Sequence, residues 1–213
     1  MRGRQIAGLL ALAVLAGIGG LFAGSFVTHS GPPPWLVDLL SHNGGGQKLA
    51  QWWLDASAPA APPGVQVAGL GDAAPDLVLR DLAGTERRLS QWRGKAVLVN
   101  FWATWCGPCR EEMPALDAAR KAFSANGVEV VGIALDDADS VRAFLAASPV
   151  SYPILLAAPG GPSPAVAFGN VREVLPYSVL VDRQGHLQRQ HLGGLSSSQL
   201  NQWLQFSGDP PTR

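Results

Sequence analysis

Residues 97–109 read VLVNFWATWCGPC. The first six form an apolar run of the type and length of a buried strand, and the next three form a short turn, so Cys106 should open a helix. Both cysteines of the 213-residue chain, Cys106 and Cys109, lie in this passage with two residues between them. Two thiols at this spacing can close and open a small disulfide ring reversibly, which predicts a protein that moves electrons between thiols.

The predicted position of Cys106 at the start of a helix favours its thiolate over its thiol. The first helical turn has unpaired backbone N–H groups and the positive end of the helix dipole. Such surroundings and Cys-X-X-Cys geometry lower the pKa of a thiol from about 8.5 to roughly 3.5–7.5. Cys106 is therefore the candidate nucleophile, and Cys109, one turn further along, is the natural resolving thiol. Pro108 suits the first turn, where no backbone N–H is needed.

Three other uses of a cysteine pair fit this chain less well. A structural zinc site needs four nitrogen or sulfur ligands, and the chain has one Cys-X-X-Cys and four scattered histidines: His29, His42, His186 and His191. A c-type haem attachment needs His directly after the second cysteine, where this chain has Arg110. A purely structural disulfide across so short a loop would stabilise the fold little, because the entropic gain grows with loop length.

Residues 100–114, NFWATWCGPCREEMP, resemble the active-site stretch of the TlpA/ResA-type thiol-disulfide oxidoreductases, which are membrane-anchored relatives of thioredoxin. The resemblance extends over about residues 71–206. Three further segments sit where that family has similar sequence: PDL at 75–77, LSQWRGK at 89–95 and LPYSVLVD at 175–182. The active-site motif is highly specific, and the flanking segments support it.

The resemblance implies a role for each residue of the motif. Cys106 would be the exposed nucleophile, Cys109 the resolving thiol, and Pro176 a cis-proline that faces the disulfide. The alternative for Pro176 is an ordinary turn proline that opens the strand at Tyr177. In relatives, the backbone beside this proline pairs with an incoming chain as a short added strand. The residues implied to bind and orient a client are Trp105, Gly107, Pro108, Leu175 and Pro176.

Glu112 is the candidate residue for proton transfer at the site. This residue matches an acidic residue that the family places near the active site, three positions after Cys109, where it could assist the proton transfer at that thiol. The alternative is a first-turn carboxylate favoured by the helix dipole. Asn100 stands where thioredoxin has a buried aspartate that acts as a base, so proton transfer must use another route, such as Glu112 or water.

The N-terminus predicts an extracytoplasmic location. Residues 6–27 carry no charge and as a helix would span about 33 Å, the thickness of a bilayer core. A cleavable signal peptide is the alternative. Because Arg2 and Arg4 precede this stretch and no positive residue follows until Lys48, residues 1–5 should stay in the cytoplasm. In a bacterium the domain would then lie in the periplasm, attached to the inner membrane or, after cleavage, secreted into that compartment.

Composition divides the rest of the chain into two parts. Residues 28–69 are rich in Pro and Gly and predict a tether with two possible short amphipathic helices. Residues 70–213 are long enough for one domain with its own core. The 16 basic and 16 acidic residues balance, so the chain offers no basic field for nucleic acid.

The order of elements predicts an α/β, thioredoxin-like fold. A strand at 97–102, a helix at 106–125 and a strand at 128–135 make a βαβ unit with parallel strands. Asp139 or Ser140 is expected to cap a second helix. The full expectation is a central mixed β-sheet flanked by helices and preceded by an N-terminal transmembrane helix.

The C-terminal part of the domain predicts two further elements. Strands at 177–181 and 186–191 flank a four-residue turn and should form a hairpin. Ser196 and Gln199 have the spacing of a capping box ahead of a final helix. In this arrangement the cysteines lie at the carboxyl end of a central strand, where open α/β sheets usually place their sites.

The resemblance favours reduction over oxidation. Relatives reduce disulfides in selected extracytoplasmic clients, including apocytochromes c and copper-delivery proteins, and are recharged by a membrane thiol transporter of the DsbD/CcdA type. The redox-active Cys106–Cys109 pair would need no other cofactor. Two alternatives stay open: a thiol peroxidase of the peroxiredoxin or glutathione-peroxidase type, and a tethered module that delivers a soft metal ion through the two thiols.

Overall fold

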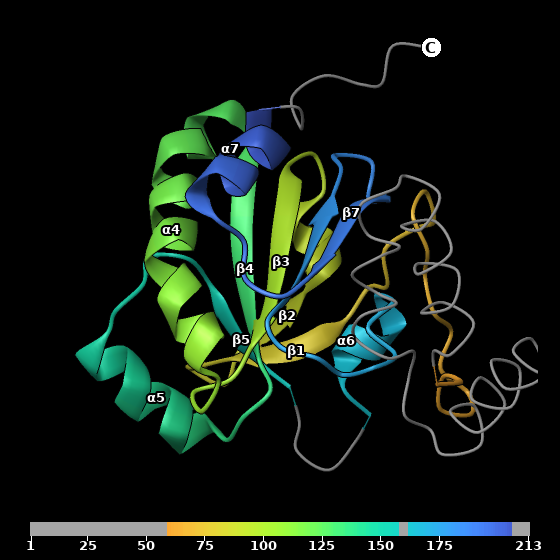
Figure 1. The fold of residues 1–213 in the computed structure, drawn as a ribbon, viewed down its shortest axis with the longest axis horizontal. Helices are drawn as coiled ribbons and strands as arrows, with labels where there is room; N and C mark the ends of the chain where they lie inside the picture. Colours follow the sequence, from red (N-terminus) through yellow and green to blue (C-terminus); the bar gives the residue numbers. More distant parts are fainter. Residues whose placement is uncertain (1–58, 158–161, 206–213) are drawn as a thin grey trace, which may run out of the picture. The chain divides into compact units, whose positions relative to one another are not determined.

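The computed structural model describes residues 59–157 and 162–205. These residues form a mixed seven-stranded sheet with helices on both faces (Figure 1). Its strands are β1 (Val78–Asp81), β2 (Glu86–Arg88), β3 (Ala96–Trp102), β4 (Val128–Ala134), β5 (Ile154–Leu156), β6 (Tyr177–Val181) and β7 (Leu187–Leu192). The helices are α4 (Gly107–Phe123), α5 (Ala138–Ala147), α6 (Pro164–Ala167) and α7 (Ser197–Gln205), with short 3-10 turns η1 (Leu89–Trp92) and η2 (Ser124–Asn126).

The expected anchor at 6–27 and residues 28–58 of the expected tether lie outside the described residues. Within 59–157 and 162–205, no helix combines the length and the apolar character that a membrane span requires.

The strands follow the order β2-β1-β5-β4-β3-β6-β7, which makes β3 an interior strand. It pairs in parallel with β4 and antiparallel with β6, and all seven of its residues are buried. This agrees with its near-continuous apolar sequence, since a strand covered on both faces needs no polar alternation. The expected α/β fold with a central mixed sheet is therefore confirmed.

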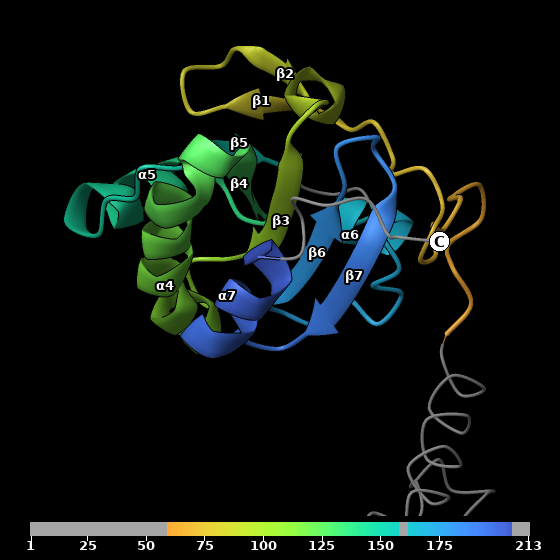
Figure 2. The same cartoon turned by 90° about the horizontal axis from the view of Figure 1, so that it is seen from above.

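Each face of the sheet has its own core, because successive side chains of a strand point to opposite faces. Leu98 and Trp102 of β3 pack in the cluster that also holds buried residues of α4, α5 and α7. Val99 and Phe101 pack in the other cluster, with residues of α6. Figure 2 shows α4, α5 and α7 on one side of the sheet and α6 on the other.

Most of the predicted elements form, with small changes at their ends. The βαβ unit is β3, α4 and β4, and the hairpin is β6 with β7. The capping box at the start of α7 is confirmed: the Ser196 N–H donates to Gln199 Oε1 at 3.0 Å, and the Gln199 N–H donates to Ser196 Oγ at 3.3 Å.

The predicted cap of the second helix is wrong. Neither Asp139 nor Ser140 caps α5; both lie inside the helix. The cap is Asp137, whose carboxylate accepts the backbone N–H groups of those two residues at 3.1 and 2.9 Å. A cap needs extended backbone dihedrals and a side chain that reaches the second and third N–H groups of the helix, and Asp137 meets both conditions.

Candidate active site

The passage from β3 into α4 positions the two cysteines. Cys106 is the cap residue of α4, and its backbone N–H donates to Ala103 O at 3.2 Å, which closes the turn after β3. Cys106 and Cys109 form a disulfide with an S–S distance of 2.01 Å and a Cα–Cα distance of 5.3 Å. The Cys109 N–H points at Cys106 Sγ, 3.3 Å away. The first turn of the helix therefore directs a backbone donor at the sulfur of the first cysteine, which favours a thiolate there after reduction.

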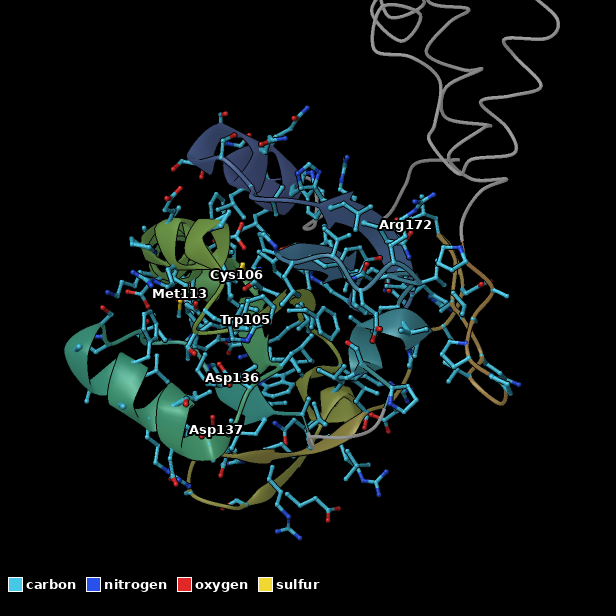
Figure 3. The ribbon with its side chains drawn as sticks, turned by 60° about the horizontal axis from the view of Figure 1, so that its bottom comes forward. Trp105, Cys106, Met113, Asp136, Asp137 and Arg172 are labelled. Atoms are coloured by element: carbon cyan, nitrogen blue, oxygen red, sulfur yellow. A yellow bond between two sulfur atoms is a disulfide. The ribbon has the colours of Figure 1, made fainter. Side chains whose placement is uncertain are left out.

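The two cysteines differ little in exposure. Cys109 is fully buried, whereas 5% of Cys106 is exposed. The expectation of an exposed nucleophile therefore needs correction: Cys106 is the more accessible of the two, but it is a buried member of the core cluster. Its neighbours Gly107 and Pro108 are exposed, and Trp105 is 70% exposed. In Figure 3 the Trp105 side chain lies beside Cys106.

The Leu175–Pro176 peptide bond is cis, as the resemblance implied, and it directly precedes β6. Leu175 packs against the core cluster that contains both cysteines and also against the cluster on the other face of the sheet. The Pro176 carbonyl accepts the Gly193 N–H at 2.8 Å. Among the hydrogen bonds of the described residues, by contrast, none uses the N–H or C=O of Leu175.

Glu112 lies in the interior of the site and holds two donors from other elements. It is 5% exposed, and it follows Cys109 by three residues, so the two side chains share one face of α4. The Asn100 Nδ2 donates to Glu112 Oε1 at 2.7 Å, and the Leu195 N–H donates to Glu112 Oε2 at 2.8 Å. The same Nδ2 of Asn100 also donates to Ser178 Oγ at 3.0 Å.

The environment of Glu112 suits a proton acceptor. Burial raises the pKa of its carboxyl above the ordinary value, and the hydrogen bonds from Leu195 and Asn100 offset only part of this effect. The alternative that Glu112 is a first-turn carboxylate at a helix end is wrong, since the first turn of α4 contains no acidic residue. A buried carboxylate beside the resolving thiol, with an elevated pKa, can take up the proton that this thiol must lose.

Two further contacts at the site were not predicted from the sequence. One is the Asn100–Ser178 hydrogen bond, which joins β3 to β6 behind Glu112. The other joins Thr104, in the turn before Cys106, to Asp136, which follows β4. A signal for Asp136 existed: the carboxyl ends of parallel strands meet at one edge of a sheet, so a carboxylate just after β4 lies near the residues just after β3.

The candidate metal ligands predicted for this site are the two cysteine sulfurs. Among residues 59–157 and 162–205, no group of three or more His, Cys, Asp or Glu side chains lies close enough together to hold a metal ion. In the oxidised state described here, both sulfurs are already bonded to each other.

Comparison with known proteins agrees with this geometry. Residues 70–190 match the AhpC/TSA family. The chain is 36% identical over 138 residues to the thioredoxin-like protein YneN of Bacillus subtilis, covering 63% of this chain and 78% of that protein. It is 32% identical over 137 residues to the thiol-disulfide oxidoreductase ResA of Geobacillus thermodenitrificans, covering 64% and 76% respectively.

A solved structure shows the same arrangement of elements. It is the crystal structure of a Chlorobium tepidum protein assigned as the thiol:disulfide interchange protein DsbE, with a TM-score of 0.61 and 32% sequence identity. The alignment covers 67% of this chain and 99% of that one. A thioredoxin-related protein of Neisseria meningitidis serogroup B is similar at 34% identity and a TM-score of 0.56, over 61% of this chain and 97% of that one.

Proposed function

The chain belongs to the AhpC/TSA family and is a thiol-disulfide oxidoreductase of the ResA/DsbE type, and from this premise we propose that it reduces disulfides in client proteins. The observation that carries the proposal is the buried pair of Cys109 and Glu112 on one face of α4. A resolving thiol beside a carboxylate of raised pKa is suited to complete dithiol exchange.

The proposed reaction has two exchanges. The Cys106 thiolate attacks the disulfide of the client, so that the client S–S bond breaks, a mixed disulfide forms and one client thiolate leaves. Glu112 then takes the proton of Cys109, and the resulting thiolate attacks Cys106 Sγ. The mixed disulfide breaks, the Cys106–Cys109 disulfide forms, and the second client thiolate leaves. Two electrons pass to the client, and its two sulfurs take up two protons, including the one held by Glu112.

The client is proposed to dock as a short added strand. The N–H and C=O of Leu175 are not used within the described residues, and this backbone directly precedes Pro176. Pairing there would bring the client disulfide toward Cys106, with the exposed Trp105, Gly107 and Pro108 as the opposite wall. Main-chain hydrogen bonds depend little on the client's sequence, so side-chain contacts must supply any selectivity. The exposed Trp105 is the side chain best placed to make an apolar contact with the client.

The proposed setting is the periplasmic side of a bacterial inner membrane. The uncharged stretch at 6–27 supports an anchor, and the positive residues before it support this orientation. In an oxidising compartment the reduced state must be restored by a supplied reductant, for which a membrane thiol transporter of the DsbD/CcdA type is the proposed donor. Apocytochromes c and proteins that receive copper are the client classes that we propose.

The test of this function is a redox equilibrium. The full-length chain is equilibrated with glutathione buffers, and the alkylation state of Cys106 and Cys109 is read at each ratio. A potential near that of thioredoxin, about −270 mV, is expected for a reductase. A potential near that of DsbA, about −120 mV, would reverse the proposed direction of electron flow.

Two further measurements separate this function from the alternatives. In a Cys109→Ser variant, fast oxidation of Cys106 by peroxide would indicate a thiol peroxidase, because that chemistry needs a single reactive thiol. Copper(I) binding that survives competition with a chelator would indicate metal delivery, whereas thiol turnover in the absence of metal supports the reductase.

A further inference from the structure

Asp136 makes a contact that ties two loops of the site together. The backbone N–H of Thr104 donates to Asp136 Oδ2 at 3.1 Å, and the Thr104 hydroxyl donates to the same oxygen. The other carboxylate oxygen of Asp136 accepts the N–H of Asp137 at 2.9 Å, where Asp137 is the cap of α5. One carboxylate therefore holds both the turn before Cys106 and the start of α5 (Figure 3).

The held turn is the segment that sets the position of Cys106. The turn runs from Ala103 to Trp105, and the Cys106 N–H closes it by donating to Ala103 O at 3.2 Å. On the far side of Cys106, the Cys109 N–H meets its sulfur at 3.3 Å. Rotation of the turn would move the sulfur away from this donor and from the helix N-terminus, and both stabilise the thiolate.

We propose that Asp136 is a positioning residue for thiol exchange, acting through Thr104 to keep Cys106 at the first turn of α4. This inference rests on the proposed role of Cys106 as the nucleophile. Asp136 touches neither sulfur; its effect is the orientation of the turn. The Thr104 hydroxyl is the critical link, because one carboxylate oxygen of Asp136 accepts it together with the backbone N–H of the same threonine.

A second aspartate accepts the backbone N–H and the hydroxyl of one residue at a position away from the disulfide. Asp76 accepts the backbone N–H of Ser90 at 2.8 Å and its hydroxyl at 2.9 Å. Ser90 lies in η1, which precedes the amino end of β3, whereas Thr104 follows the carboxyl end of that strand. The Asp76–Ser90 pair is therefore a control: its donors are the same two groups of one residue, accepted by two carboxylate oxygens instead of one, and the full length of β3 separates it from the disulfide.

The test measures the reactivity of Cys106 in the full-length chain. In a Cys109→Ser background Cys106 is the single thiol, and its rate of alkylation by iodoacetamide as a function of pH reports its pKa. Thr104→Val removes the hydroxyl at constant volume and is expected to raise this pKa and slow alkylation at pH 7 by roughly three- to tenfold. Thr104→Ser keeps the hydroxyl and is expected to restore the wild-type profile.

A double-variant cycle tests whether Asp136 and Thr104 act as one unit. Asp136→Ala is expected to shift the profile at least as far as Thr104→Val, and the double variant no further than Asp136→Ala alone. The control, Ser90→Ala, is expected to leave the profile unchanged even if it lowers the melting temperature. Should Asp136→Ala fail to fold, the comparison of Thr104→Val with Thr104→Ser carries the test.

Two results would overturn the inference: a folded Thr104→Val variant with the wild-type profile, or a Ser90→Ala variant that shifts the profile as much. Neither depends on the reduction of a client. If the wild-type chain failed to reduce any client, the proposed function would fail while the alkylation profiles stayed interpretable, so the two failures are distinguishable.

Discussion

Two glutamates, one in α4 and one in β4, are equally buried and have different hydrogen-bond partners. Glu112, near the disulfide, and Glu129, at the start of β4, are each 5% exposed. Glu112 is held by neutral donors, the Asn100 amide and a backbone N–H. Glu129 is held by two cations, with Arg120 Nε at 2.5 Å and Lys95 Nζ at 3.3 Å.

This difference separates two regions of the molecule: a reactive end, which holds Cys106, Cys109 and Glu112, and a supporting end, which holds Glu129 and its two cationic partners. A carboxylate paired with cations holds the elements that carry them together through charge-assisted hydrogen bonds. Glu129 thereby joins β4 to α4 and to the residue before β3. The hydrogen bonds of Glu112 within the described residues come from neutral donors, and burial raises its pKa, which is the basis of its proposed role as a proton acceptor. Burial alone therefore does not distinguish a candidate reactive carboxylate from a structural one. The charge of the hydrogen-bond partners distinguishes these two glutamates.

The largest effect is expected from the cysteines of the reactive end. Cys106→Ser should abolish reduction of a client disulfide, because the attacking sulfur is lost. Cys109→Ser should instead accumulate a mixed disulfide between Cys106 and the client, since the resolving thiol is absent. Non-reducing gel electrophoresis with a model client distinguishes the two outcomes. A trapped complex in the Cys106→Ser variant would reverse the assigned roles.

The second prediction contrasts the two glutamates directly. Glu112→Gln should lower the rate of resolution by roughly 100-fold, the low end of general acid–base contributions. Glu129→Gln should leave that rate unchanged and instead lower the free energy of unfolding by about 1–3 kcal/mol, because charge-assisted hydrogen bonds are lost. Stopped-flow reduction and urea denaturation of both variants measure the contrast. Equal losses of the resolution rate in the two variants would show that Glu112 has no special role in the reaction.

The third prediction concerns pH. Because the pKa of Glu112 is raised in the folded protein, its charged form is disfavoured there. Its contribution to stability is therefore present below the ordinary carboxyl pKa and is lost as the pH rises through the raised value. The resolution rate should change in the opposite sense, rising over this interval as the basic form appears. Both trends should be absent in Glu112→Gln; a trend that persisted in the variant would assign them to another group.

The smallest effect is expected at Trp105. This side chain is 70% exposed, so Trp105→Ala should scarcely change stability. Loss of an apolar wall should raise KM for a client by roughly three- to tenfold, which corresponds to about 1 kcal/mol, with kcat nearly unchanged. Steady-state kinetics with a protein client measures this, and a small-molecule disulfide serves as the control. A loss confined to kcat would place Trp105 in the chemistry instead of in docking.

Local patterns predicted the reactive end well. The apolar run at 97–102, the turn and the Cys-X-X-Cys passage are neighbours in the chain, and they form β3 and the start of α4 as expected. The final helix was equally predictable, because its capping box connects residues only three apart. The edge strands β1 and β2 were not predicted. The three residues of β2, Glu86–Arg88, are all exposed, so its sequence shows no apolar alternation.

The amino-acid sequence was sufficient for the position of the disulfide, since helix initiation and the reach of a Cys-X-X-Cys pair depend on adjacent residues. The surroundings of that disulfide came from folding. Glu112 meets Leu195 across 83 positions of the chain, and Thr104 meets Asp136 across 32. A sequence pattern can identify a candidate carboxylate. The pKa of that carboxylate and its effect on a neighbouring loop depend on donors from distant parts of the chain, because desolvation and hydrogen bonding depend on which groups are close in space.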